Sequence, residues 1–368
     1  MKNYIPSLNG LRALSITIVI FFHLMAANTF GALQIPFPFS IFCDGNFGVN
    51  VFFVISGFLI TTLLIAEEKE QGTINIGDFY IRRIFRIFPP YYFVLFVYLI
   101  LELYSALHFS RQSWLSSIFY YKYFVRGDTE TAHFWSLSVE EHFYLVWPIV
   151  FLLFKRSRAF FAFGIILLVF LCRTFAYYNI LHLPIIGDWA FIFQRVDAIM
   201  IGCLFAMYRV PLSSWLDKFM SAKFIPLLLL VLFVNSRYLV GWNEQYRFHL
   251  GFLLVPLGIG SSIGTLTNLL IATVLLYSVN YKNGWSKFLN RPAMNYIGRL
   301  SYSLYLWQQL FIMSGQLKVL NKFPVSLLCT VCAALFSYYF VELPFLRLKS
   351  RLESMSMRNQ LAALYAAI

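Results

Sequence analysis

The sequence of 368 residues is 60% hydrophobic and only 12% charged, and its mean hydropathy is +0.70. A soluble domain carries about twice this charged fraction, so a water-soluble enzyme is excluded, because its surface would be far too apolar. The net charge of +13 is typical of basic loops held on the cytoplasmic side of a membrane, and no basic patch interleaved with aromatic residues indicates nucleic-acid binding. The composition predicts an all-α polytopic membrane protein.

Apolar segments long enough to cross a bilayer recur along the chain. We place ten transmembrane helices near residues 10–29, 47–66, 89–108, 134–154, 159–178, 191–208, 223–240, 260–279, 293–314 and 325–345. Lysine and arginine concentrate in the loops on the side of the two termini, which the positive-inside rule assigns to the cytoplasm. We expect both termini to be cytoplasmic, with a transmembrane domain over residues 1–346 and a short basic cytoplasmic tail over residues 347–368.

The first apolar segment contains two ionisable residues, Arg12 and His23. An ionisable side chain at membrane depth costs about 2.5 kcal/mol or more, so it usually has a task there. At ~100° per residue both point from the same helix face, roughly 16 Å apart along the axis. We expect Arg12 at the inner edge and His23 in the outer half, where an imidazole can act as a general base on a hydroxyl. The alternatives are a snorkelling arginine and a hydrogen-bonded core histidine.

Two arginines, Arg83 and Arg86, precede the third span and share a face if that stretch is helical. Together they could clamp a phosphate-rich ligand, since a guanidinium matches phosphate oxygens bidentately. The alternative is an anchor to anionic lipid headgroups. Arg12 is expected at the same inner edge, so three arginines converge there in this interpretation.

Two carboxylates and a histidine, Glu140, Glu141 and His142, enter the fourth span from the outer side. Glu140 lies roughly 9 Å deep at helical rise, a depth similar to that of His23. A buried carboxylate beside an imidazole would orient the ring, so we expect Glu140 to orient His23. The alternative for Glu140 is a hydrogen bond or salt bridge between helices.

The sixth span begins with Arg195 and Asp197, and Arg173 lies in the fifth. These charges form either a structural ion pair, which we favour, or part of a polar pocket for an acceptor, together with Glu141 and His142. No spacing of histidine, cysteine or carboxylate residues indicates a metal site.

Six motifs, in this order and at these spacings, resemble the membrane-bound acyltransferase 3 family of bacteria, which includes O-antigen and exopolysaccharide O-acetyltransferases. They are residues 8–14 (LNGLRAL) with His23, residues 48–60 (GVNVFFVISGFLI), Arg83-x-x-Arg86 before Pro89 and Pro90, residues 134–140 (FWSLSVE), Arg195-x-Asp197, and residues 297–307 (IGRLSYSLYLW). Two departures are His142, where members often have glutamine, and Gln308, where many carry histidine.

The resemblance implies transfer of an acyl group, usually acetyl, from cytoplasmic acyl-CoA to a hydroxyl of a cell-surface carbohydrate such as O-antigen, exopolysaccharide or a glycolipid. It implies an essential histidine at His23 with a partner arginine at Arg12, and an arginine pair at Arg83 and Arg86 that serves the donor. Glu140 matches the acidic position of the family in the fourth span. Because Arg12 is expected at the same inner edge, we expect acyl-CoA to bind at Arg12, Arg83 and Arg86. Acetyl-CoA is then a donor substrate and no cofactor is permanently bound. The protein is expected in the bacterial inner membrane, without a fused periplasmic domain, so that its own outer loops or a separate periplasmic protein recognise the acceptor.

Several alternatives stay open at this point. A multi-pass transporter or flippase of a polar or acylated metabolite would also place charged residues in its spans. Within the enzyme interpretation, the sequence separates neither direct transfer from an acyl-histidine intermediate nor one acceptor, acyl chain or oligomeric state from another.

Overall fold

The computed structural model describes residue 5 and residues 7–27, 44–125, 128–177, 195–219, 264–317 and 320–351. All of the regular elements in these ranges are helical, which confirms the predicted all-α class. In chain order they are α1 (Leu8–Ala26), α3 (Gly45–Gln71), α4 (Ile76–Leu103), α5 (Arg111–Ile118), η1 (Lys122–Phe124), α6 (Thr129–Ala132), α7 (Phe134–Leu153), α8 (Arg158–Tyr177), α10 (Val196–Met207), α11 (Arg209–Phe219), α13 (Thr265–Asn280), α14 (Gly284–Leu289), α15 (Pro292–Ile312), α16 (Val325–Ser337) and the π-helical turn η2 (Tyr338–Glu342).

Within the described residues, six helical stretches are long and apolar enough to cross a bilayer, and α10 and α13 are shorter apolar helices. Nine of the ten expected spans coincide with a helix, whereas the span expected at residues 223–240 lies outside the described residues. Most of the expected tail, from residue 352 onward, also lies outside them. Ten crossings, cytoplasmic termini and the division between domain and tail therefore stay predictions.

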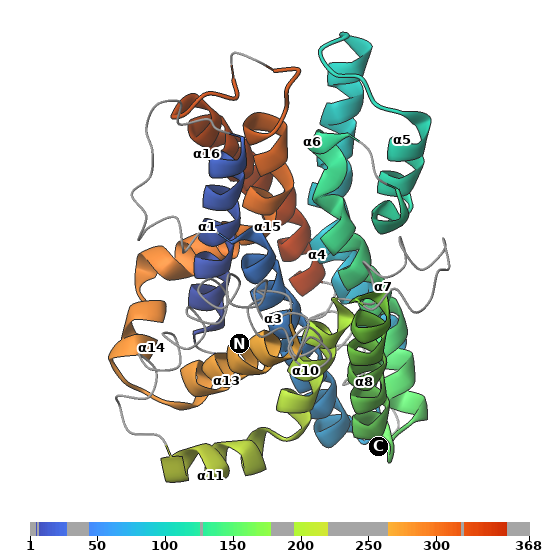
Figure 1. Cartoon of the computed structure of the whole chain (residues 1–368), viewed down its shortest axis with the longest axis vertical. Coiled ribbons are helices and arrows are strands. Elements are labelled where there is room, and N and C mark those ends of the chain that lie inside the picture. The colour runs from blue at the N-terminus through green and yellow to red at the C-terminus, as the bar shows by residue number, and fades with distance from the viewer. Residues whose placement is uncertain are drawn as a thin grey trace, which may run out of the picture.

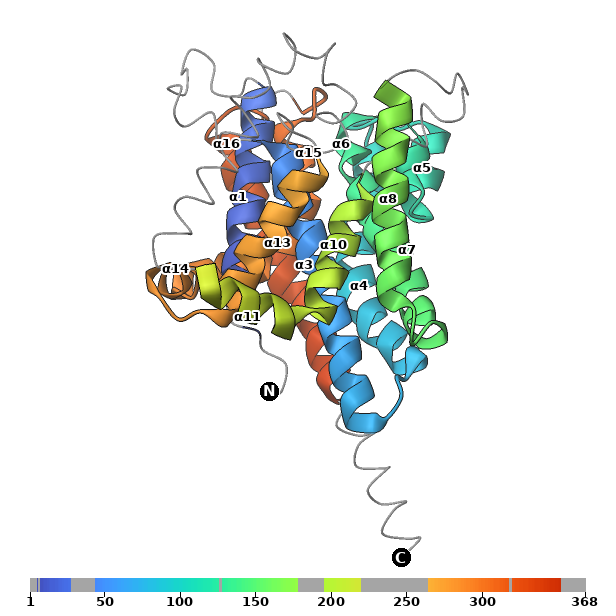
Figure 2. The same cartoon turned by 60° about the horizontal axis from the view of Figure 1, so that its bottom comes forward.

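Helix α3 occupies the centre of the bundle, where it packs most extensively against α10 and also contacts α1 and α7 (Figure 1). Helix α15 packs along α1 on one side and α16 on the other. Turning the molecule shows the long helices running alongside one another, with α11 and α14 lying crosswise near the lower ends of α1 and α13 (Figure 2). This arrangement lets α1, α3, α7 and α15 present side chains to a shared interior.

Glycines allow a very close helix contact between α3 and α10. A Cβ added to Gly57 would collide with the backbone carbonyl of Ile199, and one added to Gly202 would collide with the carbonyl of Val54. Small residues permit such backbone approach between helices in a membrane, where packing replaces the hydrophobic effect as the driving force. The contact fixes α10, and hence Asp197, beside α3.

Helix α4 begins well before the span that we expected at residues 89–108. Asn75 caps its first turn by accepting a hydrogen bond from the Asp78 amide, and the helix continues through Pro89 and Pro90. The expected start was therefore wrong: capping carries the helix back through the charged segment. As a result Arg83 and Arg86 lie inside α4, where a separation of three residues puts them on the same side.

Candidate active site

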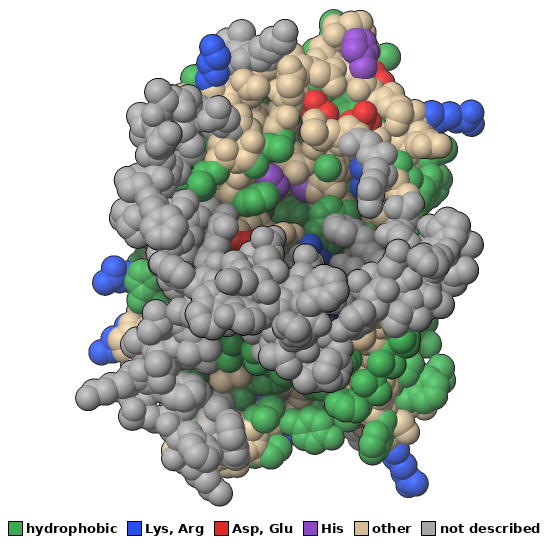
Figure 3. Space-filling model, viewed as in Figure 1, with side chains coloured by type: hydrophobic (Ala, Val, Ile, Leu, Met, Phe, Trp, Pro, Cys, Tyr) green, Lys and Arg blue, Asp and Glu red, His purple; other side chains and the backbone are tan. Residues whose placement is uncertain are grey.

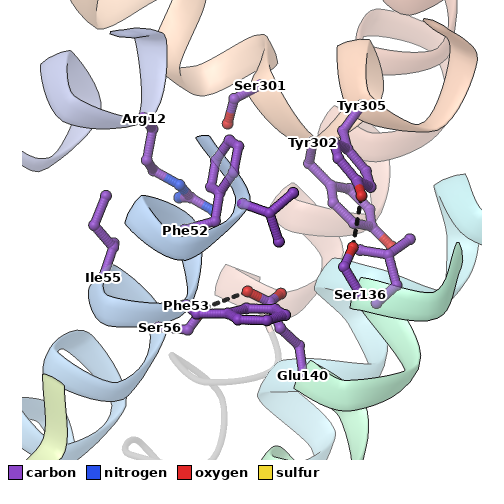
Figure 4. Close-up of a pocket in the computed structure, with 12 residues that line it drawn as sticks. Arg12, Phe52, Phe53, Ile55, Ser56, Ser136, Glu140, Ser301, Tyr302 and Tyr305 are labelled. Carbon is purple, nitrogen blue, oxygen red and sulfur yellow. Dashed lines mark hydrogen bonds between the residues drawn. The ribbon is translucent and has the colours of Figure 1, made fainter. Parts of the chain in front are cut away.

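A pocket in the interior of the bundle lies between α1, α3, α7 and α15 (Figure 4). Its lining combines charged and hydroxyl groups with aromatic rings. The residues that line it are Arg12, Val49, Phe52, Phe53, Ile55, Ser56, Ser136, Leu137, Glu140, Ser301, Tyr302 and Tyr305. Two of the predicted site residues, Arg12 and Glu140, thus face one cavity from different helices.

Glu140 is held at this pocket by hydroxyl groups. Its Oε1 accepts a hydrogen bond from Ser56 Oγ of α3 at 2.8 Å, and its Oε2 accepts one from Tyr144 Oη, one helical turn further along α7, at 3.4 Å. Ser56 Oγ and Tyr144 Oη are themselves 2.9 Å apart. The three groups therefore form a closed polar triangle, in which the carboxylate joins α7 to α3.

The expectation that Glu140 orients His23 is wrong in this structure. The imidazole of His23 contacts glutamines of α15 instead, whereas the charges that act on Glu140 are those of Arg12 and Arg83. The physical reason is the stagger of α1 and α7: Glu140 enters the pocket beside the inner half of α1, where Arg12 lies. Glu140 consequently lies close to Arg12 and Arg83 and not to His23.

The three predicted arginines converge near the inner end of the pocket. Arg12 and Arg86 are near enough for their positive charges to repel, and the charge of Arg86 also repels that of Arg83. The Arg83 guanidinium lies over the Tyr144 ring, 4.8 Å from its centroid. The Nε of Arg12 is buried and has no hydrogen-bond partner within the described part of the chain. Such a cluster of cations is stable only beside carboxylates or an anionic ligand.

A further carboxylate, Glu342, faces this cluster although the sequence analysis did not select it. It is 3% exposed and accepts a hydrogen bond from Ser303 Oγ at 2.9 Å. The positive charges of Arg86 and Arg12 attract its carboxylate. Glu342 ends the π-helical turn η2, and such turns are frequent at functional sites. A signal was present, because a carboxylate in an apolar span is rarely without a task.

His23 lies further along the same face of α1, toward its C-terminal end. Its Nδ1 is 3.0 Å from Gln308 Oε1, and its Nε2 is 3.3 Å from Gln309 Nε2. Arg12 shares its pocket with Ser301 of α15, so both Arg12 and His23 face that helix, as their spacing predicted. Gln309 in turn contacts His133, the residue that precedes α7. Sequence reasoning missed Gln309, because an uncharged amide near the end of an apolar helix carries no distinctive signal.

The four residues expected to form an acceptor pocket do not share one cavity. Asp197 is bound bidentately by Arg173 of α8, at 2.7 and 2.9 Å, and also accepts hydrogen bonds from Thr265 and Asn268. Arg195 donates to Asn46 of α3 at 2.7 Å. The structural ion pair that we favoured among these charges therefore exists, between Arg173 and Asp197.

Glu141 and His142 lie on the other side of α7. His142 is exposed and its Nδ1 contacts the Tyr123 hydroxyl at 3.2 Å and the Ser138 carbonyl at 2.8 Å. The carboxylate of Glu141 is repelled by the charge of Glu140 and attracted by that of Arg83. Successive residues of a helix point about 100° apart, so neither side chain can join Arg195 and Asp197 across the bundle.

The outer half of this face is hollowed. In the space-filling view, histidine side chains lie within a recess in the upper part of the molecule, bordered by apolar side chains and backbone (Figure 3). The arrangement as a whole places Arg12, in the arginine cluster, and His23 roughly 16 Å apart along α1.

Comparison with known proteins supports a catalytic interpretation of this arrangement. The chain matches the acyltransferase 3 model, described as an acyltransferase domain, over residues 5–342. It is 30% identical over 376 residues to the O-acetyltransferase OatA of Staphylococcus aureus strain NCTC 8325, and this match covers 93% of the chain and 57% of OatA. It is 28% identical over 384 residues to SACOL0978 of S. aureus strain COL, which carries a provisional O-acetyltransferase name, with the same two coverages. The chain thus spans little more than half the length of these relatives. No solved structure matches it significantly.

Proposed function

Because the chain belongs to the acyltransferase 3 family, we propose that it is a membrane-bound O-acyltransferase of the bacterial inner membrane. It moves an acetyl group from cytoplasmic acetyl-CoA to a hydroxyl of a cell-surface carbohydrate. The O-acetyltransferase names of its relatives support the acetyl group and the oxygen acceptor. The observation that carries the proposal is that Arg12 and His23 both face α15, one in the arginine cluster and the other in the outer half.

The arginine cluster is the proposed donor site. Guanidinium groups bind phosphate oxygens bidentately, and the nucleotide end of coenzyme A carries the phosphates. The positive charge of Arg86 repels those of Arg12 and Arg83, so an anionic ligand bound among them would relieve this repulsion. The pantetheine arm then extends along the interior face of α1 and α15 and brings the thioester toward His23.

His23 is the proposed general base. As the acceptor hydroxyl attacks the thioester carbonyl, its O–H bond breaks and the proton passes to a ring nitrogen of His23. The new C–O bond forms, the C–S bond breaks, and the thiolate leaves with the electron pair of that bond. The thiolate then takes the proton from the imidazolium, which restores neutral His23. An acyl-histidine route differs in that the ring nitrogen itself first attacks the carbonyl.

Transfer by the purified protein tests this proposal. The protein is reconstituted in lipid nanodiscs with radiolabelled acetyl-CoA and a soluble carbohydrate acceptor, and the label on the carbohydrate is counted. We expect label with the wild type, a loss of at least 100-fold for His23→Ala, and full activity for the control His108→Ala, which replaces an exposed histidine. Activity of His23→Ala equal to that of the wild type would overturn the proposal for His23, and movement of unlabelled acceptor across the membrane of sealed proteoliposomes would indicate a transporter.

A further inference from the structure

A backbone amide fixes the orientation of the Gln309 side chain. The backbone N–H of His133, which can only donate, points to Gln309 Oε1 at 3.0 Å, and His133 Nδ1 lies 2.9 Å from the same oxygen. A partner that can only donate distinguishes the oxygen of an amide side chain from its nitrogen. The oxygen of Gln309 therefore faces His133, and its NH2 group faces the other way.

That NH2 group faces His23. Gln309 Nε2 lies 3.3 Å from His23 Nε2, and because the amide nitrogen can only donate, His23 Nε2 must present its lone pair. The proton of the neutral ring is then on Nδ1, where Gln308 Oε1 accepts it at 3.0 Å. The ring of His133 has its Nε2 3.1 Å from the carbonyl oxygen of Leu306, which can only accept. The donor that fixes the oxygen of Gln309 is therefore the backbone N–H of His133 and not its ring.

We propose that Gln308 and Gln309 are positioning residues that hold neutral His23 as the Nδ1–H tautomer, so that Nε2 is the atom that takes the proton of the acceptor hydroxyl. This inference rests on the proposed function of His23. Which nitrogen of a histidine is protonated is set by the partner of the other nitrogen, and here two adjacent residues of one helix provide both partners. A free imidazole side chain favours the Nε2–H form, so the two glutamines select the less favoured tautomer.

The geometry also leaves a place for the hydroxyl. The contact of His23 Nε2 with Gln309 is 3.3 Å, at the long end for a hydrogen bond, whereas that of Nδ1 with Gln308 is 3.0 Å. A hydroxyl that inserts between His23 and Gln309 donates its proton to Nε2 and accepts from the amide NH2. The Gln308 contact meanwhile keeps the ring in place. The exchange keeps the NH2 group of Gln309 and the Nδ1–H of His23 paired, so the site can admit an acceptor hydroxyl.

Gln308 adds an independent observation. It is fully buried, yet its Nε2 has no hydrogen-bond partner within the described part of the chain. An unpaired buried donor is unfavourable, and turning the amide round would present that NH2 to His23 Nδ1. With the amide turned round, Nδ1 of His23 would have to accept the hydrogen bond and Nε2 would have to carry the proton. That proton would then point at the NH2 group of Gln309, which is also a donor. The anchored orientation of Gln309 therefore explains why Gln308 keeps its oxygen on His23.

Nitrogen NMR reads the tautomer directly and needs no activity. The full-length protein, labelled with ¹⁵N-histidine, is studied in nanodiscs at a pH where the ring of His23 is neutral, and the signals of His23 are assigned as those missing from His23→Ala. We expect the proton on Nδ1 and a bare Nε2. The opposite assignment in the wild type would overturn the proposal, whatever the activity of any variant, so a wrong tautomer is distinguishable from a wrong catalytic histidine.

The variant Gln309→Glu reverses the partner of Nε2 at nearly constant size. One carboxylate oxygen still accepts from the His133 amide, while the other replaces the NH2 that faces His23. We expect the proton to move to Nε2 and kcat to fall about 100-fold with the KM for acetyl-CoA unchanged. The matched control Gln112→Glu makes the same chemical change at an exposed position of α5 and should leave both values unchanged. A Gln309→Glu protein with the wild-type tautomer and full kcat would refute the positioning role.

Discussion

Ser56 of α3 donates a 2.8 Å hydrogen bond to Glu140 of α7, and this bond joins the two helices at the pocket that also holds Arg12. The carboxylate therefore lies at the arginine end of the site and not at the imidazole end. Its negative charge offsets those of Arg12 and Arg83, which act on it most strongly among the charged groups. The relationship places the two proposed tasks of the site, donor binding and proton transfer, at different ends of α1.

Glu140→Gln should therefore weaken donor binding more than it alters proton transfer. The amide preserves a hydrogen bond with Ser56 but removes the charge that orients the guanidinium groups. We expect the KM for acetyl-CoA to rise about tenfold and the pH profile of kcat to keep its shape, as measured by steady-state acetyl transfer. Glu70→Gln, an exposed change near the end of α3, is the control. A profile displaced along the pH axis in Glu140→Gln would instead connect Glu140 to His23.

Arg83→Lys tests the planar guanidinium at the donor site. The Arg83 group stacks over the ring of Tyr144 at 4.8 Å, and a lysine neither stacks in this way nor binds phosphate bidentately. We expect a rise of about tenfold in the Kd of coenzyme A, measured by isothermal titration calorimetry, at unchanged charge. Arg82→Lys is a matched control in the neighbouring position, because Arg82 pairs with Glu67 at 2.8 Å. Equal effects of the two substitutions would argue against a specific donor site at Arg83.

Glu342 and Ser303 should act as one unit. Ser303 Oγ donates to the buried Glu342 at 2.9 Å, and the charges of Arg86 and Arg12 act on the same carboxylate. Glu342→Gln and Ser303→Ala should each raise the Kd of coenzyme A, and their double variant should be no worse than Glu342→Gln alone, because residues in one network do not contribute additively. A double-variant effect equal to the product of the two single effects would show that Ser303 and Glu342 act independently.

The helical period predicted the relation of Arg12 to His23, because a residue spacing determines a helix face. The same reasoning could not predict the partner of Glu140, since the rotation and stagger of α7 against α1 depend on contacts along both whole helices, such as the glycine contact of α3 with α10. The span pattern likewise located nine helices to within several residues but missed the early start of α4, where the cap at Asn75 extends the helix through polar sequence.

The position of Glu342 depends on a feature that no apolar pattern contains. A π-helical turn adds a residue to one turn of a helix, so the side chains beyond it rotate relative to a regular 3.6-residue period. Extrapolation along α16 would therefore assign Glu342 to the wrong face. The role inferred for Gln309 depends on the backbone of His133, which is 176 residues away in sequence and comes close only when α7 and α15 pack.

The buried pair of Arg173 and Asp197 should contribute to stability. The two side chains are 6% and 0% exposed and 2.7 Å apart, and removing one partner of a buried pair costs about 3–5 kcal/mol because the other charge is left uncompensated. Asp197→Asn should therefore lower the melting temperature of the detergent-solubilised protein markedly. Glu67→Gln, which removes a more exposed pair with Arg82, should cost about 1 kcal/mol or less. Similar losses for the two variants would contradict this difference in burial.

Because of Lys122, the free energy of unfolding of the protein should change with pH in the alkaline range. It lies outside the candidate spans, its side chain is buried with Nζ donating to Ser113 Oγ at 2.9 Å, and desolvation lowers its pKa from 10.5 to about 8. The unfolded chain therefore binds more protons than the folded one between about pH 8 and 10.5, and the contribution of Lys122 to the free energy of unfolding rises with pH across that window.

Replacing Lys122 by methionine removes this contribution. The variant Lys122→Met should melt at a higher temperature than the wild type at pH 7, where burying the charged ammonium group is unfavourable. The difference should shrink steadily as the pH is raised from 8 to 10, because the folded wild type then carries a neutral amine. Thermal unfolding followed by tryptophan fluorescence at several pH values measures this. A difference in melting temperature that stays constant from pH 7 to pH 10 would show that the ammonium group of Lys122 is not desolvated in the folded protein.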